Sequence, residues 1–155
     1  MSTRQKFKIK DYMQTEVTTI RSSAKFIDAV DIMMKKHRNG LVVLDRKNKV
    51  VGMLSSLHLI KHIVPDYLED DKHLAAFEAG DIFIKRTKEV HNDPVKLFMN
   101  TDFHPVNAED SLMEAATLMS EFNVRHLPVV DSNGLLVGYI TRTDIKKAIG
   151  KILTT

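Results

Sequence analysis

The chain of 155 residues contains no cysteine, and its six glycines and four prolines are widely spaced. Without cysteine it cannot form disulfides, thiolate zinc sites or a cysteine nucleophile. The dispersed glycines build no phosphate-binding loop between a strand and a helix. No serine nucleophile motif accompanies the histidines either. These absences leave no residues from which an active site can be assembled, so an enzyme is not expected.

Long hydrophobic runs are also missing. No apolar run approaches the roughly 18 residues of a membrane span, and the first ten residues are basic and polar with no apolar segment behind them. We therefore expect no membrane association and no secretory signal, which leaves a cytoplasmic location by elimination. The chain is 43% hydrophobic and 28% charged, as is typical of a folded globular protein.

Positive charge is only slightly in excess. Twenty-three Lys and Arg residues against 20 Asp and Glu leave a net charge of +3, with a sequence pI near 9.1. The basic residues are scattered over chain ends, helix ends and turns, whereas a polyanion site should gather them on one face. A solvated surface is the favoured interpretation, and nucleic-acid binding is not expected. Polyanion binding stays as a third alternative.

The sequence repeats itself. A shift of 86 residues, Met99 minus Met13, brings two long stretches into register without a gap. Residues 41–45 (LVVLD) then lie on 127–131 (LPVVD), and residues 51–55 (VGMLS) lie on 137–141 (VGYIT). The matched positions include turn-forming residues as well as apolar ones, so we interpret the pattern as a duplication.

Each copy predicts the same order of elements. A short extended piece comes first (17–20 or 103–106), and a helix follows with Ser22–Ser23 or Glu109–Ser111 as its start signal. Two apolar strands joined by a polar turn come next, with Asn133–Gly134 expected to supply positive φ values, and a second helix ends the copy. The apolar positions that recur at helical spacing are Phe26, Ile27, Val30, Met33 and Met34 in one copy and Leu112, Met113, Ala116 and Met119 in the other. The methionines at this spacing are expected to pack in the core or in a dimer interface.

The expected organisation has four parts. Residues 1–12 form a basic N-terminal segment, 13–63 the first repeat, 64–95 a helical connector and 96–155 the second repeat. The connector contains the acidic run Glu69–Asp71 and shows helical spacing around Leu74, Phe77 and Ile84. A unit of about 50 residues has little core of its own, so the two copies should share one.

The stretch from Asn123 to Ile145, NVRHLPVVDSNGLLVGYITRTDI, resembles the core of a CBS motif, and the first copy resembles it more loosely. Together they are similar to a tandem CBS pair, or Bateman module. This resemblance implies an α/β (α+β) fold, in which two βαββα repeats pack sheet to sheet with pseudo-twofold symmetry. It also implies a homodimeric module that regulates a partner enzyme or transporter and needs no obligatory cofactor. Its regulatory ligand would be AMP, ADP, ATP or S-adenosylmethionine, bound in a cleft between the repeats.

The resemblance places the main ligand cleft at the start of the last helix. Asp144 would accept hydrogen bonds from the ribose hydroxyls, Thr141 would offer its hydroxyl to a phosphate, and Arg142 would neutralise one. The opposite wall would come from the first copy. Its residues would be Thr15, Thr18, Thr19, Asn39 and Gly40. From spacing alone, residues 141–144 also suit an ordinary helix cap.

A second cleft should be altered. The 86-residue shift places His58 where the second copy has Asp144, and a neutral imidazole cannot accept two hydroxyl bonds as a carboxylate does. The expected lining of this cleft is Ser55, His58, Thr101, Phe103, His104, Arg125 and His126. We therefore expect one working nucleotide site in each chain.

Two other interpretations stay open. His58 and His62 stand four apart on a predicted helix and could begin a metal site, with a third ligand from His37, His73 or His91. Histidines without a metal are the favoured interpretation, so no metal site is expected. The main rival to ligand binding is a dimeric interaction module that binds a partner and no small molecule.

Overall fold

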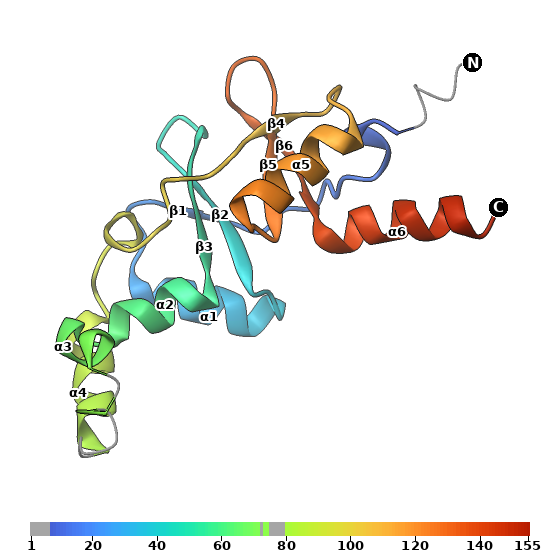
Figure 1. Ribbon diagram of the computed structural model, residues 1–155. Helices are drawn as coiled ribbons and strands as arrows, with labels where there is room; N and C mark the ends of the chain where they lie inside the picture. Colours follow the sequence, from blue (N-terminus) through green and yellow to red (C-terminus); the bar gives the residue numbers. More distant parts are fainter. Residues whose placement is uncertain (1–6, 72, 75–79) are drawn as a thin grey trace. The chain divides into compact units, whose positions relative to one another are not determined.

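The computed structural model describes residues 7–71, 73–74 and 80–155 (Figure 1). Both copies fold as βαββα, which confirms the predicted order of elements. The first copy comprises β1 (Thr19–Arg21), α1 (Phe26–Lys36), β2 (Gly40–Leu44), β3 (Val50–Ser55) and α2 (Ser56–Ile63). The second comprises β4 (Val106–Asn107), α5 (Leu112–Phe122), β5 (His126–Val130), β6 (Leu136–Thr141) and α6 (Arg142–Leu153).

Each copy builds a sheet of three strands with the middle strand of the motif at its centre. The first strand runs parallel to the middle one, with Thr19 opposite Val42 and Val106 opposite Val129. In the second copy, β5 and β6 are antiparallel, with His126 opposite Thr141. This register brings the end of β6, and so the start of α6, beside the beginning of β5.

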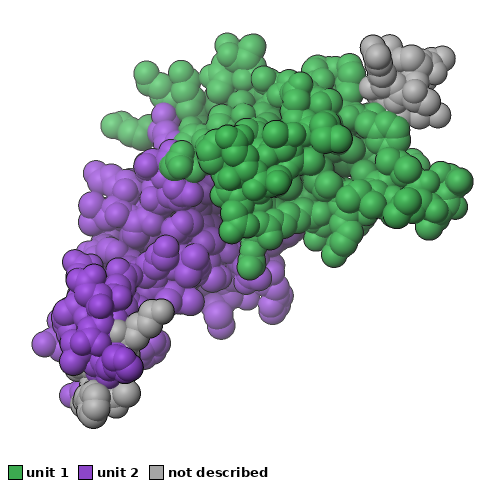
Figure 2. All heavy atoms as spheres, in the orientation of Figure 1, with its two compact units in different colours: residues 1–17, 46–50, 102–155 green, residues 18–45, 51–101 purple. Residues whose placement is uncertain are grey.

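The chain divides into two compact units that are not continuous in sequence (Figure 2). The described residues of unit 1 are 7–17, 46–50 and 102–155, and those of unit 2 are 18–45, 51–71, 73–74 and 80–101. Unit 1 therefore holds the sheet and helices of the second copy. The residues before the first copy also belong to unit 1, whereas those before the second copy belong to unit 2. We call these two stretches, 7–14 and 93–100, the lead segments.

The lead segment 7–14 is built into unit 1 by backbone hydrogen bonds. Ile9 is fully buried in the core, and its N–H donates to the carbonyl of Asp110 at 2.9 Å. Gln14 and Tyr139 exchange two backbone bonds of 2.8 and 2.9 Å, which add residue 14 to the edge of β6. The lead segment thus extends the sheet of the second copy although it precedes the first in sequence.

The lead segment 93–100 does the same in unit 2. Val95 is fully buried and donates its N–H to the carbonyl of Ala24 at 2.7 Å. Asn100 and Met53 exchange backbone bonds of 2.8 and 3.0 Å. These residues are the counterparts of Ile9, Gln14 and Tyr139 by the shift of 86, so the duplication extends to the lead segments.

A glycine stands where each lead segment meets a strand. A Cβ on Gly138 would lie 2.7 Å from the carbonyl oxygen of Gln14, which is closer than a carbon atom tolerates, so only glycine permits this approach. A Cβ on Gly52 would lie 2.8 Å from the sulfur of Met99, at the end of a flexible side chain, and 3.1 Å from the carbonyl oxygen of Asn100. The approach at Gly52 is therefore tight, but a small shift of its neighbours would relieve it.

An ion-pair cluster also holds the first lead segment. Glu109 accepts hydrogen bonds from the ammonium groups of Lys8 at 2.7 Å and Lys10 at 2.8 Å. The hydrogen bonds from Lys10 and Lys8 lower the pKa of Glu109 to about 2. The carboxylate is therefore ionised throughout the physiological range, and its contacts persist there.

Some details of the helices differ from the prediction. The first helix begins at Phe26 rather than beside Ser22–Ser23, because the carboxylate of Asp28 accepts the N–H of Lys25 at 2.9 Å and caps the helix there. Of the apolar positions at helical spacing, Ile27, Met34 and Met113 are 51%, 71% and 74% exposed. They lie about 100° around the helix from the buried Phe26, Met33 and Leu112. The Ser111 cap is confirmed, since its hydroxyl accepts the N–H of Glu114 at 3.1 Å.

The strands and turns also show small differences. β1 and β4 begin later in the sequence than the extended pieces expected at 17–20 and 103–106. In the second hairpin only Gly134 has a positive φ, of 79°, and Asn133 does not. Asp131 holds this turn by accepting the N–H groups of Asn133 and Leu135. The counterpart of Gly134 in the first hairpin is Asn48, with a φ of 65°.

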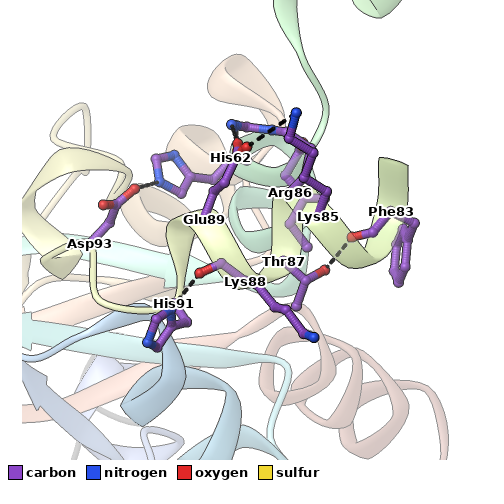
Figure 3. Close-up of polar contacts among 10 residues, drawn as sticks. His62, Phe83, Lys85, Arg86, Thr87, Lys88, Glu89, His91 and Asp93 are labelled. Carbon is purple, nitrogen blue, oxygen red and sulfur yellow. Dashed lines mark hydrogen bonds and ion pairs between the residues drawn. The ribbon is translucent and has the colours of Figure 1, made fainter. Parts of the chain in front are cut away.

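The stretch between the repeats contains two helices in its described part, α3 (Asp66–Asp70) and α4 (Asp81–Val90), while Phe77 lies outside the described residues. Arg86 fastens α4 to α2, because its guanidinium donates to the carbonyls of His62 and Ile63 at 3.1 and 3.0 Å (Figure 3). Those carbonyls end α2 and lack partners within that helix. His62 in turn bonds to Asp93 at 2.8 Å and stacks on Phe98.

Substitution of Gly138 by alanine should test the close approach of the first lead segment. We expect Gly138→Ala to lower the free energy of unfolding by about 1–3 kcal/mol, because the new methyl group forces Gln14 away from β6. Urea denaturation followed by circular dichroism measures the change.

Gly150→Ala is the control, since a Cβ at that position in α6 meets nothing within 4 Å. It should leave stability unchanged or raise it by up to about 1 kcal/mol. Equal stabilities for the two variants would contradict the role assigned to Gly138.

Candidate functional site

The polar residues predicted at the start of α6 include one buried carboxylate. Asp144 is 3% exposed, and among the residues that the structure describes it is the only buried charged side chain. It lies in the first turn of α6, a helix that begins immediately after β6 ends at Thr141. A carboxylate in this position lies at the positive pole of the helix, which stabilises its charge.

Thr141 and Asp144 form a reciprocal cap. The N–H and the hydroxyl of Thr141 donate to Oδ2 of Asp144 at 2.8 and 3.0 Å, and the N–H of Asp144 donates back to the Thr141 hydroxyl at 3.2 Å. The helix cap considered from the sequence is therefore present. Thr141 makes no contact with the other carboxylate oxygen, Oδ1. The cap thus leaves one side of the carboxylate available for other donors.

Gln14 reaches that second oxygen. Its side-chain amide Nε2 lies 3.3 Å from Oδ1 and 3.4 Å from Oδ2 of Asp144. The backbone pairing of Gln14 with Tyr139 brings the amide there. Sequence reasoning did not include Gln14 in the site. The available signal was its counterpart Asn100, because both copies carry a side-chain amide directly after the aligned methionines.

Arg142 is exposed and makes contacts within unit 1. Its Nε donates to the carbonyl of Val124 at 3.1 Å, and its Nη2 donates to the side chain of Asn123 at 3.0 Å. The backbone N–H of Arg142 also donates to the carbonyl of Arg125 at 2.9 Å. Two of the five guanidinium N–H groups are thus used to hold the start of α6 beside the end of α5.

The other residues predicted for the main cleft are divided between the two units. Thr15 belongs to unit 1 with Thr141 and Asp144, whereas Thr18, Thr19, Asn39 and Gly40 belong to unit 2. Within unit 2 their backbone groups support the sheet and α2. The Thr18 carbonyl accepts the N–H of Val42, and the Asn39 carbonyl accepts the N–H of Ser56, both at 3.1 Å.

His58 takes over the capping role of Asp144 in the first copy. Its Nδ1 lies 2.9 Å from both the N–H and the hydroxyl of Ser55, as Oδ2 of Asp144 bonds to the same two groups of Thr141. A backbone N–H always donates, so Nδ1 is the unprotonated nitrogen of the ring. Burial, and then the charge of Lys61, lower the pKa of His58. The neutral ring therefore caps α2 but offers no second acceptor like Oδ1.

The remaining residues predicted for the second cleft are also divided. Ser55 and Thr101 belong to unit 2, and Phe103, His104, Arg125 and His126 belong to unit 1. His104 stacks on Phe122, with ring centroids 3.8 Å apart, and the ring of His126 lies edge-on to that of Tyr139. The two histidines of unit 1 thus pack against aromatic rings.

The two histidines on α2 have different partners, His58 bonding to Ser55 and His62 to Asp93. Over the described ranges 7–71, 73–74 and 80–155, no group of three potential ligands from His, Cys, Asp and Glu comes together to hold a metal ion. In the same part of the chain, no helix has both the length and the apolar character needed to cross a bilayer.

The repeats, their βαββα order and the capped acid after the last strand agree with the comparison to known families. The sequence model of the CBS domain matches residues 9–65 and again residues 95–151. These two matches cover more than half of the chain, which therefore belongs to the CBS domain family and carries the domain as a tandem pair. Both matches include most of a lead segment.

Solved structures of CBS pairs have the same fold. The structure of CBSX2 in complex with AMP has a TM-score of 0.72 and 25% identity, and the match covers 94% of this chain and 98% of CBSX2. The CBS domain pair of protein MJ0100, solved with 5′-methylthioadenosine and S-adenosyl-L-methionine, has a TM-score of 0.68 at 22% identity and is similar in fold. That match covers 93% of this chain and 96% of the MJ0100 pair.

Several relatives are much longer proteins. The chain is 25% identical over 144 residues to the A-adding tRNA nucleotidyltransferase of Aquifex aeolicus, covering 93% of this chain and 14% of that enzyme. It is 47% identical over 111 residues to the L-aspartate semialdehyde sulfurtransferase of Methanocaldococcus jannaschii, covering 68% of this chain and 22% of the enzyme. The chain thus spans less than a quarter of either relative.

The cap made by His58 should make stability depend on pH. The pKa of His58 in the folded chain is below the ordinary value of 6.5. Just below pH 6.5, this side chain therefore binds more protons in the unfolded chain than in the folded chain. The stabilising contribution is therefore complete above pH 6.5 and is lost as the pH falls through the folded pKa. Thermal unfolding of the wild type and of His58→Asp at pH 7.5 and pH 5 measures this loss.

The aspartate of the variant stays ionised at pH 5, since its ordinary pKa is about 3.9. The variant should therefore gain stability relative to the wild type on acidification, while the other six histidines are common to both. Parallel pH dependences in the two proteins would show that His58 does not carry the effect.

Proposed function

We propose that this CBS pair is a non-catalytic regulatory module that binds an adenosine-containing ligand through Asp144. The ligand would change the affinity of the module for a partner enzyme or transporter. The proposal rests above all on Asp144, a buried carboxylate at the N-terminus of α6 with one oxygen outside the helix cap.

The chemistry of this position suits a ribose. A ribose carries two neighbouring hydroxyl groups, both able to donate hydrogen bonds, and Oδ1 has lone pairs that the Thr141 cap leaves unused. Hydrogen bonds to a charged acceptor are stronger than those between neutral groups. The N-terminal end of α6 also favours the negative charge of a phosphate. Arg142, in the first turn of the same helix, would add a positive charge.

Similarity to CBSX2 supports an adenine nucleotide as the ligand. That protein was solved with AMP, and it matches almost the full length of this chain. Among the adenosine-containing candidates we therefore place AMP first, with ADP, ATP and S-adenosylmethionine as alternatives. The enzymes among the relatives are several times longer than the match, so their names assign no reaction to this chain.

One ligand per chain is the expected ratio. His58 holds the position in the first copy that Asp144 holds in the second, and its only acceptor nitrogen is occupied by Ser55. The other ring nitrogen, Nε2, carries the proton and is a donor, so it cannot accept a hydrogen bond from a ribose hydroxyl. The ribose contacts proposed for Asp144 therefore have no equivalent at His58.

We also propose that the module acts as a homodimer. Ile27 on α1 and Met113 on α5 are counterparts by the shift of 86, and both are more than half exposed. Large apolar side chains at equivalent exposed positions are typical of residues that a partner subunit covers. The regulated protein would bind to the dimer, and the chemistry of that protein is not encoded in these residues.

Calorimetric titration with AMP, ADP, ATP and S-adenosylmethionine tests the proposal. We expect Asp144→Asn to weaken binding by at least about 30-fold, because the charge that receives the ribose hydroxyls is lost. Asparagine keeps an oxygen that can cap α6, so the variant should still fold. His58→Ala should bind within about twofold of the wild type.

Two results would contradict this assignment. Equal losses in the two variants would mean that both copies bind ligand or that neither position contacts it. No heat from any of the four compounds, at protein concentrations that detect millimolar affinity, would exclude an adenosine ligand and favour the interaction module.

A further inference from the structure

The carboxylate that would receive a ribose is covered by a side chain from the lead segment. Asp144 is 3% exposed, although only Oδ2 takes part in the helix cap. Gln14 extends its amide over the other side and lies within hydrogen-bond distance of both carboxylate oxygens. A ligand that bonds to Oδ1 must therefore meet Gln14 first.

A count of hydrogen-bond sites shows why the amide and a ribose would compete. A carboxylate offers about four lone-pair sites, two on each oxygen. The N–H and the hydroxyl of Thr141 fill those of Oδ2, and the amide of Gln14 lies on Oδ1. Both the amide and a hydroxyl pair are donors, so they seek the same lone pairs.

The contact of Gln14 is suited to being broken. Its distances of 3.3 and 3.4 Å are long beside the 2.7–2.9 Å usual for a charge-assisted bond, so the amide is held weakly. The backbone of residue 14 is fixed by its two bonds to Tyr139, whereas the unbranched side chain can rotate. The amide can leave the carboxylate without unpairing the lead segment from β6.

We infer that Gln14 is a displaceable cover, which occupies the hydroxyl-binding side of Asp144 in the free protein and leaves it when a ligand diol binds. The inference rests on the proposed function, because it assumes that the ligand reaches Asp144. It adds a residue that sets affinity through competition. It also links ligand binding to the lead segment 7–14, since the released amide belongs to that segment.

The first copy has a histidine in place of this carboxylate. The counterparts of Gln14 and Asp144 are Asn100 and His58, and the acceptor nitrogen of His58 bonds to Ser55. No carboxylate stands there for an amide to occupy. Asn100 therefore provides a control of the same chemical type in the same position of the other unit.

Ligand affinity of Gln14→Ala is the first test. The variant should bind AMP about threefold to tenfold more tightly than the wild type in calorimetric titration, because no amide has to be displaced. Asn100→Ala should bind within twofold of the wild type. Weaker binding by Gln14→Ala would show that Gln14 contacts the ligand. Unchanged binding would show that Gln14 does not compete with it. Either result would contradict the inference that Gln14 is a displaceable cover.

A second measurement needs no ligand. The exchange of the Gln14 side-chain amide protons with water, followed by NMR, should be slow in the free protein and faster in Asp144→Ala. Addition of AMP to the wild type should accelerate it in the same way. Exchange that is equally fast in the wild type and in Asp144→Ala would overturn the cover.

The two measurements separate this inference from the proposed function. If the wild type binds AMP but Gln14→Ala is unchanged, the cover is wrong and the proposed function stands. If the wild type binds none of the four compounds, the proposed function fails, and the exchange rate in the free protein alone decides whether Gln14 covers Asp144.

Discussion

The pairing of each lead segment with the last strand of a copy is the constraint on which the two units depend. Gln14 pairs with Tyr139 on β6, and Asn100 pairs in the same way with Met53 on β3. The neighbouring strand residue is glycine in both copies, and at Gly138 the backbone of Gln14 approaches too closely for any other residue. Because each lead segment precedes one copy and completes the other, the chain crosses between units. Neither unit is therefore assembled from a continuous stretch of sequence.

The difference between the two copies lies in the side chain that caps the last helix. In both, the residue that begins the last helix is capped by the side chain three positions later, so the local structure is preserved. Histidine in one copy and aspartate in the other both make this cap, but only the aspartate has a second acceptor oxygen outside it. The lead segment places the amide of Gln14 over that oxygen. The two copies therefore share the helix cap and differ in the acceptor that lies beside it.

Sequence patterns were sufficient for features that depend on local chemistry. The unbroken apolar runs at 41–44 and 127–130 lie in buried strands, and the caps at Ser111 and Thr141 begin helices where expected. The start of α1 was misplaced because Asp28 caps from inside the helix, which competes with the serines before it. The role of Gln14 could not be seen, because its contacts with Tyr139 and Asp144 join residues more than 120 positions apart. The backbone pairing between residues so far apart leaves no periodic pattern in the sequence. It also depends on the absence of a side chain at Gly138. The resemblance to CBS motifs identified Asp144 but not what covers it.

A crystal structure of the protein with AMP tests the central claim most directly. The claim is that the Asp144 carboxylate binds the ribose and that the Gln14 amide leaves this carboxylate when the ligand binds. The account predicts both ribose hydroxyls within hydrogen-bond distance of the Asp144 carboxylate, the Thr141 cap intact, and the Gln14 amide turned away with its backbone still paired to Tyr139. A bound nucleotide whose ribose lies elsewhere, while Gln14 keeps its contact with Asp144, would contradict it.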